Sequence, residues 1–151
     1  MTDFEEQFPD LYRVAYRVAF RIVGQREEAE DVAQEALARA LARWPKVHGH
    51  AAAWVARVSG NLAIGAWRRI ARKTPPMPQP PPSTEALVID RADLVRALRS
   101  ISRRQREVVV LRYLADLPED AVADAIGSSV GTVKQHASRG LAALRTPLAD
   151  R

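Results

Sequence analysis

The sequence predicts an all-α fold made of two small helical domains joined by a proline-rich linker. Hydrophobic residues make up 47% of the chain, and alanine, leucine, valine and arginine dominate its composition, which favours helices. Apolar residues recur at spacings of three and four, and few regions alternate with the period of two that strands require. Six of the eleven residues from Thr74 to Thr84 are proline, so no helix or strand is expected to cross this segment.

The proline-rich segment separates the expected domains, which are residues 1–73 and 86–151, with a linker over 74–85. A chain of this composition adopts an extended polyproline conformation at about 3.1 Å per residue. The eleven residues from Thr74 to Thr84 could therefore span roughly 34 Å as a semi-rigid spacer.

Three helices are expected in the first domain, from about Pro9 to Val23, Arg26 to Arg43 and Ala51 to Arg72. Gly24 ends the first helix, and four acidic residues in the first turns of the second helix favour its dipole. A loop is expected over 45–50, where a proline follows the second helix.

The second domain is expected to begin with a helix over about Ala86–Ile101. Ser102 is a suitable N-cap for a following helix over Arg103–Tyr113. Residues 117–145 then have the spacing of a helix, a tight turn and a second helix, as in a DNA-binding helix-turn-helix.

The helix-turn-helix prediction depends on a small residue at the helix crossing and a glycine in the turn. Ala123 is small enough for the crossing, and Gly127 tolerates the positive φ that the turn requires. Either Ser128 or Ser129 can cap the second helix. The apolar contact between the two helices is expected from Val122, Ile126 and Val133.

The second helix of this motif has a polar surface of the kind that recognition in the major groove requires. Helix pairs joined at a glycine are also common in proteins that do not bind DNA, so the pattern alone leaves both interpretations open. The candidate residues for DNA contact are Ser129, Thr132, Lys134, Gln135, His136, Ser138 and Arg139.

The distribution of charge favours nucleic acid as a partner. The net charge is +5, yet residues 1–35 hold nine acidic side chains against four arginines. No Asp or Glu occurs from Ala36 to Thr84, or from Ala125 to Ala149. Two basic segments that are separate in sequence suggest two contacts to a polyanion.

The sequence contains no arrangement of residues that is typical of a catalytic site. There is no cysteine, the three histidines are not spaced as metal ligands, and neither a Ser-His-Asp arrangement nor a glycine-rich phosphate loop is present. We therefore expect no enzymatic activity, no cofactor and no metal. No signal peptide or membrane-spanning run is found, so a cytoplasmic location is expected.

Three segments together resemble the extracytoplasmic-function (ECF) group of bacterial sigma factors, and the actinobacterial SigE-like type in particular. These segments are AEDVAQEALARA at 29–40, WVARVSGNLAIGAWRRIARK at 54–73 and GTVKQHASRGLAALR at 131–145. The resemblance implies a subunit that binds core RNA polymerase and directs promoter-specific initiation. The first domain would be region 2, which recognises and melts the −10 element, and the second would be region 4, which recognises the −35 element.

Asp31, Gln34 and Glu35 share one face of the second expected helix, because they lie at positions i, i+3 and i+4. A solvated helix surface would show the same residues, but the resemblance implies that this face docks the clamp coiled coil of the largest polymerase subunit. It also implies contact with the flap of the second-largest subunit and a possible anti-sigma factor as a further partner.

The third expected helix matches the family's −10 segment. An unstacked base needs an aromatic or apolar wall together with hydrogen-bond donors, and Asn61 matches the family position near that base. Trp54 is expected to pack in the core, whereas Trp67 suits either role. The resemblance implies −10 contacts from Lys46, His48, Arg57, Asn61, Trp67, Arg68 and Arg69.

Two positions depart from the family pattern. Gly65 stands where many relatives have an acidic residue, and a glycine inside a helix costs about 1 kcal/mol relative to alanine. The linker is rich in proline where many relatives have acidic residues.

The sequence leaves two alternative functions open. One is a helix-turn-helix regulator that binds duplex DNA without polymerase, and the other is a helical module that sequesters a protein and has no DNA function. The acid-free span that begins at Ala36 argues against the second alternative.

Overall fold

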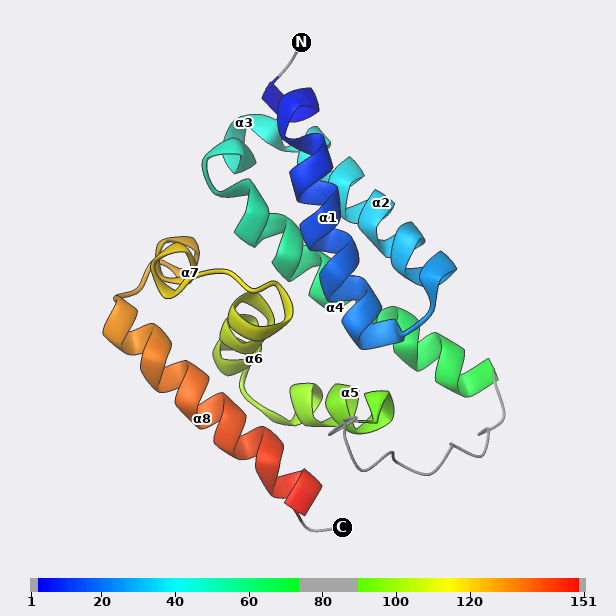
Figure 1. Cartoon of the computed structure of the whole chain (residues 1–151), viewed down its shortest axis with the longest axis vertical. Coiled ribbons are helices and arrows are strands. Elements are labelled where there is room, and N and C mark those ends of the chain that lie inside the picture. The colour runs from blue at the N-terminus through cyan, green and yellow to red at the C-terminus, as the bar shows by residue number, and fades with distance from the viewer. Residues whose placement is uncertain (1–2, 74–89, 150–151) are drawn as a thin grey trace.

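The computed structural model describes residues 3–73 and 90–149, and these residues form helices and no strand (Figure 1). The all-α prediction is therefore confirmed. The expected linker over 74–85 lies outside the described residues. The helix expected over about Ala86–Ile101 begins only at Arg91, because Asp90 has the non-helical backbone of an N-cap.

The N-terminal half is built on three long helices, α1 (Asp3–Val23), α2 (Arg26–Ala42) and α4 (Ala51–Lys73), which all pack against one another. The short helix α3 (Trp44–Val47) and the 3₁₀ turn η1 (His48–His50) connect α2 to α4. The alanine-rich inner face of α2 lets the three helices approach closely.

A core within the N-terminal half fixes α4 against α1. Leu37 and Val55 are fully buried in it, and Trp54 packs there as expected, with 9% of its surface exposed. The hydroxyl of the buried Ser59 donates a 2.6 Å hydrogen bond to the carbonyl of Ala15. This bond satisfies a polar group that would otherwise be costly to bury.

Two of the boundaries predicted for the N-terminal half were wrong. Helix α1 begins at Asp3 rather than at Pro9, because Phe4 is buried against Trp44 with its ring centroid 5.2 Å away, and this contact orders the first turns. The expected loop over 45–50 is helical, because a proline in the first turn of a helix costs no hydrogen bond.

The C-terminal half contains α5 (Arg91–Ser100), α6 (Arg103–Val109), the π-helical turn η2 (Val110–Leu114), α7 (Glu119–Ile126) and α8 (Val130–Ala149). Helix α8 packs along α5, α6 and α7. The helix predicted over 103–113 is present, but its last turn widens, since the amide of Ala115 donates to the carbonyl of Val110 at 2.9 Å.

Side-chain caps fix the beginnings of α5 and α6. The hydroxyl of Ser102 accepts a 3.2 Å hydrogen bond from the amide of Gln105, so the predicted cap is confirmed. Asp90 caps α5 in the same way, through the amide of Ala92 at 3.1 Å.

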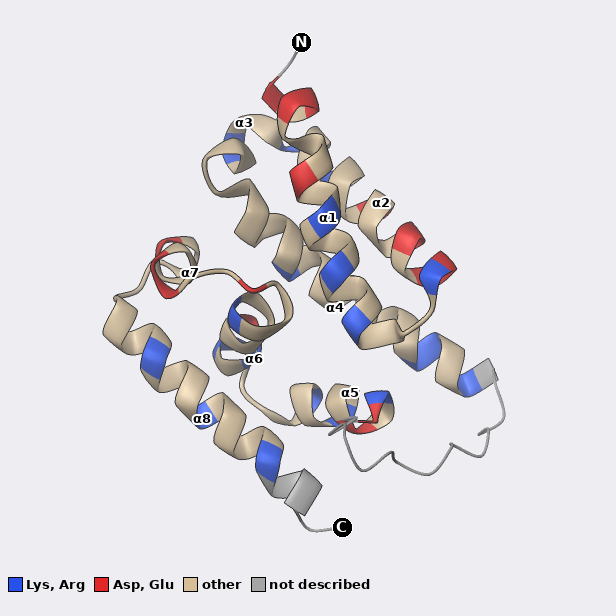
Figure 2. Cartoon of the chain, in the orientation of Figure 1, with Lys and Arg blue, Asp and Glu red and all other residues tan. Residues whose placement is uncertain are grey.

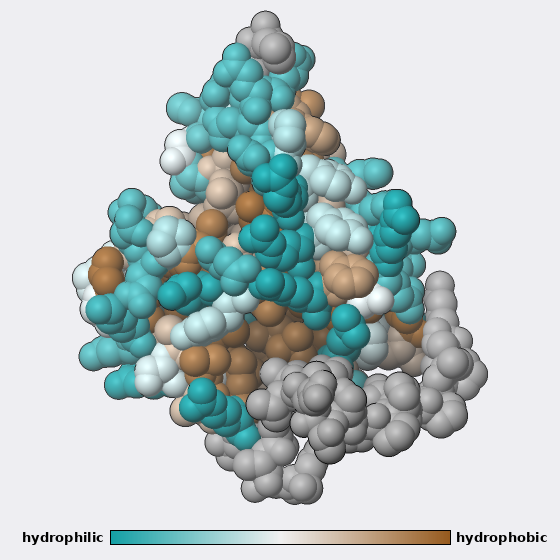
Figure 3. All heavy atoms as spheres, viewed as in Figure 1, coloured by the Kyte–Doolittle hydropathy of each residue, from teal (hydrophilic) through white to brown (hydrophobic). Residues whose placement is uncertain are grey.

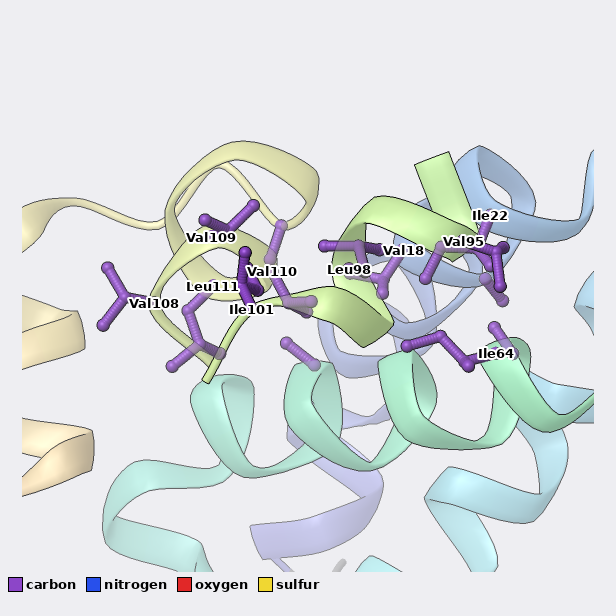
Figure 4. Packing of buried hydrophobic residues seen from close by; sticks show 14 of the residues in the cluster. Val18, Ile22, Ile64, Val95, Leu98, Ile101, Val108, Val109, Val110 and Leu111 are labelled. Carbon is purple, nitrogen blue, oxygen red and sulfur yellow. The ribbon is translucent and has the colours of Figure 1, made fainter. Parts of the chain in front are cut away.

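The two halves of the chain share one hydrophobic core. Val18 and Ile22 from α1 and Ile64 from α4 meet residues of α5, α6 and η2 (Figure 4). Hydrophobic residues also gather on the surface where α1 meets α5 and α6 (Figure 3). The residues that the C-terminal half contributes include Val95, Leu98, Ile101, Val108, Val109, Val110 and Leu111.

Replacing Leu98 by alanine should lower the free energy of unfolding by about 2–5 kcal/mol, because the side chain is fully buried and its removal leaves a cavity. Leu41→Ala is the matched control, since this leucine is 55% exposed and should change stability by less than about 0.5 kcal/mol. Urea unfolding followed by circular dichroism checks both values. Equal losses for the two variants would contradict the assigned core.

Candidate nucleic-acid interface

The turn of the helix-turn-helix has the geometry that the sequence predicted. Gly127 has φ +68° and ψ +42°, which is the left-handed conformation that glycine adopts without strain. Val122 and Val133 are fully buried and Ala123 is buried at the helix crossing, whereas Ile126 is only half-buried. These contacts fix the angle between α7 and α8.

Ser129, rather than Ser128, caps α8. Its hydroxyl oxygen accepts a 3.1 Å hydrogen bond from the amide of Thr132 and lies 2.9 Å from the hydroxyl of that residue. The cap fixes the first turn of α8, which is the part of a recognition helix that contacts base edges.

The polar residues predicted on α8 lie at the surface. Lys134, Gln135, Ser138 and Arg139 are exposed together with Ser129, and Thr132 and His136 are half-exposed. Helix α8 contains no acidic residue, whereas α7 carries three, as Figure 2 shows.

One ion pair connects the acidic and basic helices of this motif. The ammonium of Lys134 lies 3.8 Å from the carboxylate of Glu119, and both groups remain accessible to solvent. Such an exposed pair contributes at most about 1 kcal/mol, so Lys134 can exchange this partner for a phosphate at little cost.

His136 differs from its neighbours on α8. Its Nδ1 atom is buried and has no hydrogen-bond partner among the described residues. The ring is therefore partly turned toward the protein, and it is less exposed to solvent than Gln135 or Arg139.

Arg57 and Asn61 lie one turn apart on α4 and line a single hollow of about 200 Å³. The opposite wall of this hollow belongs to the C-terminal half of the chain and contains Arg103, Arg106 and Glu107. The structure thus brings two of the −10 candidates together and places them against the other half of the protein.

The other −10 candidates are spread along the N-terminal half. Lys46 and His48 are exposed on α3 and η1, before α4 begins, whereas Arg68 and Arg69 are exposed near its end. At about 1.5 Å per residue, Asn61 and Arg69 are some 12 Å apart along the helix axis. The seven candidates therefore form an extended surface rather than one cluster.

Trp67 is half-buried and packs against the shared core. The sequence left its role open between packing and base stacking. The observed contacts assign at least part of the ring to packing.

Asp31, Gln34 and Glu35 are all exposed on the side of α2 that faces away from α1 and α4. Glu35 accepts a 2.9 Å hydrogen bond from the guanidinium of Arg39, one turn later. This face is thus accessible to a partner with basic groups.

Sequence reasoning missed a set of contacts that joins the two halves. Arg21 on α1 donates to the carbonyls of Tyr113 and Leu114 at 3.0 and 2.9 Å, and it pairs with Asp116 at 3.1 Å. Arg17 also lies near Asp116, at 3.7 Å. Asp116 has a φ of +57°, and no local sequence pattern predicted this left-handed backbone conformation.

Four aromatic rings stack along the exposed side of α1. Phe8, Tyr12, Tyr16 and Phe20 follow one another at intervals of four residues, with ring centroids 5.8–6.3 Å apart. The Arg91 guanidinium lies 5.9 Å from the centroid of Phe20. Burial, followed by the charge of the nearby Glu30, raises the pKa of Tyr12 above its usual value of 10.0.

Comparison with known proteins agrees with these features. Residues 7–73 match the family model "Sigma-70 region 2", and residues 91–144 match "Sigma-70, region 4". The chain is 38% identical over 106 residues to the RNA polymerase sigma-E factor of Streptomyces antibioticus. This alignment covers 67% of this chain and 58% of that relative. It is 36% identical over 116 residues to the Streptomyces coelicolor sigma-E factor. This alignment covers 72% of this chain and 65% of that relative.

The chain spans about three fifths of the length of these curated relatives. A solved complex of the sigma factor RpoE with the anti-sigma factor NepR from Bartonella quintana has a similar fold, with a TM-score of 0.58 at 22% identity over all of both chains. A structure of CnrH in complex with the cytosolic domain of CnrY has a TM-score of 0.57 at 20% identity. The match covers 97% of this chain and 88% of that one.

The protein belongs to the sigma-70 family and to its extracytoplasmic-function group. Region 2 corresponds to the helices α1 to α4 and region 4 to the helices α5 to α8. Among the described residues, no helix is both long and apolar enough to span a membrane.

Replacing Ser129 by alanine should lower the free energy of unfolding by about 1 kcal/mol, because an N-cap hydrogen bond of α8 is lost. Ser128→Ala is the control, since the hydroxyl of Ser129 supplies the cap, and this change should stay within about 0.5 kcal/mol. Urea unfolding measures both variants. If Ser128→Ala proved the more harmful change, the assigned cap would be wrong.

Proposed function

We propose that this chain is an alternative sigma factor that binds core RNA polymerase and directs initiation at promoters with its own −10 and −35 elements. The observation that carries the proposal is the recognition helix α8, which is free of acidic residues, exposes its polar face and belongs to a region 4 domain. A region 2 domain in the same chain supplies the second promoter contact.

Each of the proposed domains has its own role in this proposal. Residues 1–73 dock the clamp coiled coil of the largest subunit through Asp31, Gln34 and Glu35, and they open the −10 element along α4. Residues 86–151 place α8 in the major groove of the −35 element and contact the flap of the second-largest subunit. The segment 74–85 connects the two.

Such a protein acts by binding some DNA sequences more tightly than others, rather than by catalysis. Each good bidentate contact between a side chain and a base edge contributes about 1–3 kcal/mol of discrimination. The amide of Gln135 has a donor and an acceptor for such a contact, the guanidinium of Arg139 has two parallel donors, and Lys134 suits a phosphate. An anti-sigma factor is a further proposed partner, supported by the similar fold of a sigma factor solved in complex with one.

Reconstituted transcription tests this proposal. Core polymerase with the purified chain should initiate at a subset of a genomic promoter library, whereas core polymerase alone should not. Absence of transcripts from every promoter, together with tight and specific duplex binding by the free chain, would favour the polymerase-independent regulator instead.

The double variant Asp31→Ala, Gln34→Ala should bind core polymerase at least about tenfold more weakly, which corresponds to about 1.4 kcal/mol. The affinity of the protein for a −35 duplex should not change, because these residues lie on the exposed face of α2. Asp10→Ala is the control, since it removes an exposed carboxylate from α1 in the same domain. Fluorescence anisotropy measures both affinities, and an unaltered polymerase affinity would refute the docking face.

Replacing Gln135 or Arg139 by alanine should alter the preferred −35 sequence and cost about 1–3 kcal/mol at the base that is contacted. Replacing Lys134 should weaken binding to all sequences alike and reduce the salt dependence of log K by about 1. Selection from a randomised −35 library, at two salt concentrations, measures these effects. Arg13→Ala, an exposed arginine on α1, is the control. An unchanged preference in both the Gln135 and the Arg139 variants would mean that another face of α8 contacts DNA.

A further inference from the structure

The hollow of about 200 Å³ between α4 and α6 has more positive than negative groups in its walls. Its lining residues are Arg57, Asn61, Arg103, Arg106, Glu107 and Val110. Three guanidinium groups thus surround one small space together with a single carboxylate. Like charges at such short range repel one another, and this repulsion favours the binding of an anion between them.

The carboxylate of the hollow is shared with an arginine outside it. Glu107 lies 3.5 Å from the Nε atom of Arg103 and 3.2 Å from the Nη1 atom of Arg104. Arg104 does not line the hollow. Glu107 therefore neutralises at most one of the three positive charges around this space.

Arg106 is held in place by backbone groups. Its Nε atom donates a 2.7 Å hydrogen bond to the carbonyl of Leu98, and its Nη2 atom donates one of 3.4 Å to the carbonyl of Arg99. Carbonyl oxygens carry no net charge, so the positive charge of this guanidinium is not cancelled. A guanidinium has five N–H donors, so others remain for a ligand, and the fixed position reduces the entropy lost when a ligand binds.

Arg57 and Asn61 are unengaged on the other side of the hollow. Within residues 3–73 and 90–149, neither side chain has a hydrogen bond or an ion pair with another residue. Arg57 is half-buried and Asn61 is exposed. Their positions i and i+4 place both on one face of α4, where a guanidinium and an amide group are available as donors.

The size and the donors of the hollow together select the class of ligand. Sites that enclose small organic molecules begin at about 300 Å³, so a space of about 200 Å³ suits an inorganic anion. Guanidinium groups bind phosphate oxygens through short, charge-assisted hydrogen bonds. A tetrahedral anion has oxygens on all sides, so it can accept hydrogen bonds from α4 and α6 at once.

We propose that this hollow binds a small phosphate anion, which Arg57 and Asn61 contact from region 2 and Arg103 and Arg106 contact from region 4. A phosphate group of nucleic acid has the same chemistry, and the experiment below separates the two sources. The inference does not depend on the proposed sigma function, because the binding needs neither polymerase nor a promoter.

Isothermal titration calorimetry of the full chain with pyrophosphate, in sodium chloride at constant ionic strength, tests this site. The titration should saturate at one ion per chain. Arg57→Gln and Arg103→Gln should each weaken binding by about fivefold or more, because each removes a charged donor from the hollow. Circular dichroism checks that each variant remains folded.

Arg104→Gln is the matched control. It removes an arginine from the same helix, and this arginine pairs with Glu107 as Arg103 does but does not line the hollow. The affinity for pyrophosphate should change by less than about twofold. The net charge of +5 attracts anions in general, so equal weakening by Arg57→Gln and Arg104→Gln would show general attraction only and would overturn the site.

Glu107→Gln should strengthen binding by about threefold or more, because it removes the carboxylate from the hollow and keeps the size of the side chain. Damage to the fold would weaken binding instead, so this variant separates a direct effect on the ligand from a structural one. An affinity equal to or below that of the natural chain would contradict the proposed electrostatics of the hollow.

A single-stranded oligonucleotide without terminal phosphates, which carries only phosphodiesters, distinguishes the source of the phosphate. Saturable binding of pyrophosphate with the variant pattern given above supports the free anion. If the oligonucleotide alone bound with that pattern and pyrophosphate did not bind, the hollow would take the backbone of nucleic acid, and the free anion would be overturned as its ligand. Absence of binding by both would overturn the site itself.

Discussion

The packing of α4 between two neighbours is the constraint on which the rest of the structure depends. One side of this helix lies against α1 and α2, where the hydroxyl of Ser59 bonds to the carbonyl of Ala15. The next residue, Gly60, meets the π-helical turn η2 of the other domain. A helix that must satisfy both neighbours at adjacent positions needs small residues there, and this requirement places region 2 and region 4 in contact along one helix.

The same helix carries Arg57 and Asn61, two of the side chains proposed to act in promoter melting. Burying apolar area is favourable, and the contact of α4 with η2 buries Gly60, while the next residue, Asn61, stays exposed. The hollows lined by Arg57 show that packing between the two halves of the chain is incomplete beside this contact.

Local structure was predictable wherever one residue determines it. Gly127 predicted the left-handed turn and Ser102 predicted a cap, because each acts on neighbouring backbone groups. The helical turns over 45–50 were not predicted, because a proline after a helix indicates the end of that helix, yet it equally suits the first turn of the next one. The contact of Arg21 with Asp116 could not be predicted, since it joins residues 95 positions apart and has no periodicity. The polar surface of α8 followed from the sequence, whereas the hollow that Arg57 and Asn61 share with the C-terminal half did not.

The glycines of α4 have a consequence for the stability of this helix. Each lowers the stability of a helix by about 1 kcal/mol relative to alanine, and positions 60 and 65 flank Asn61. The close approach of Val110 makes use of Gly60, whereas a Cβ at Gly65 would meet only the end of the Arg69 side chain. The turns around Asn61 therefore depend on the packing of buried neighbours such as Ala63 and Ile64 rather than on helix propensity.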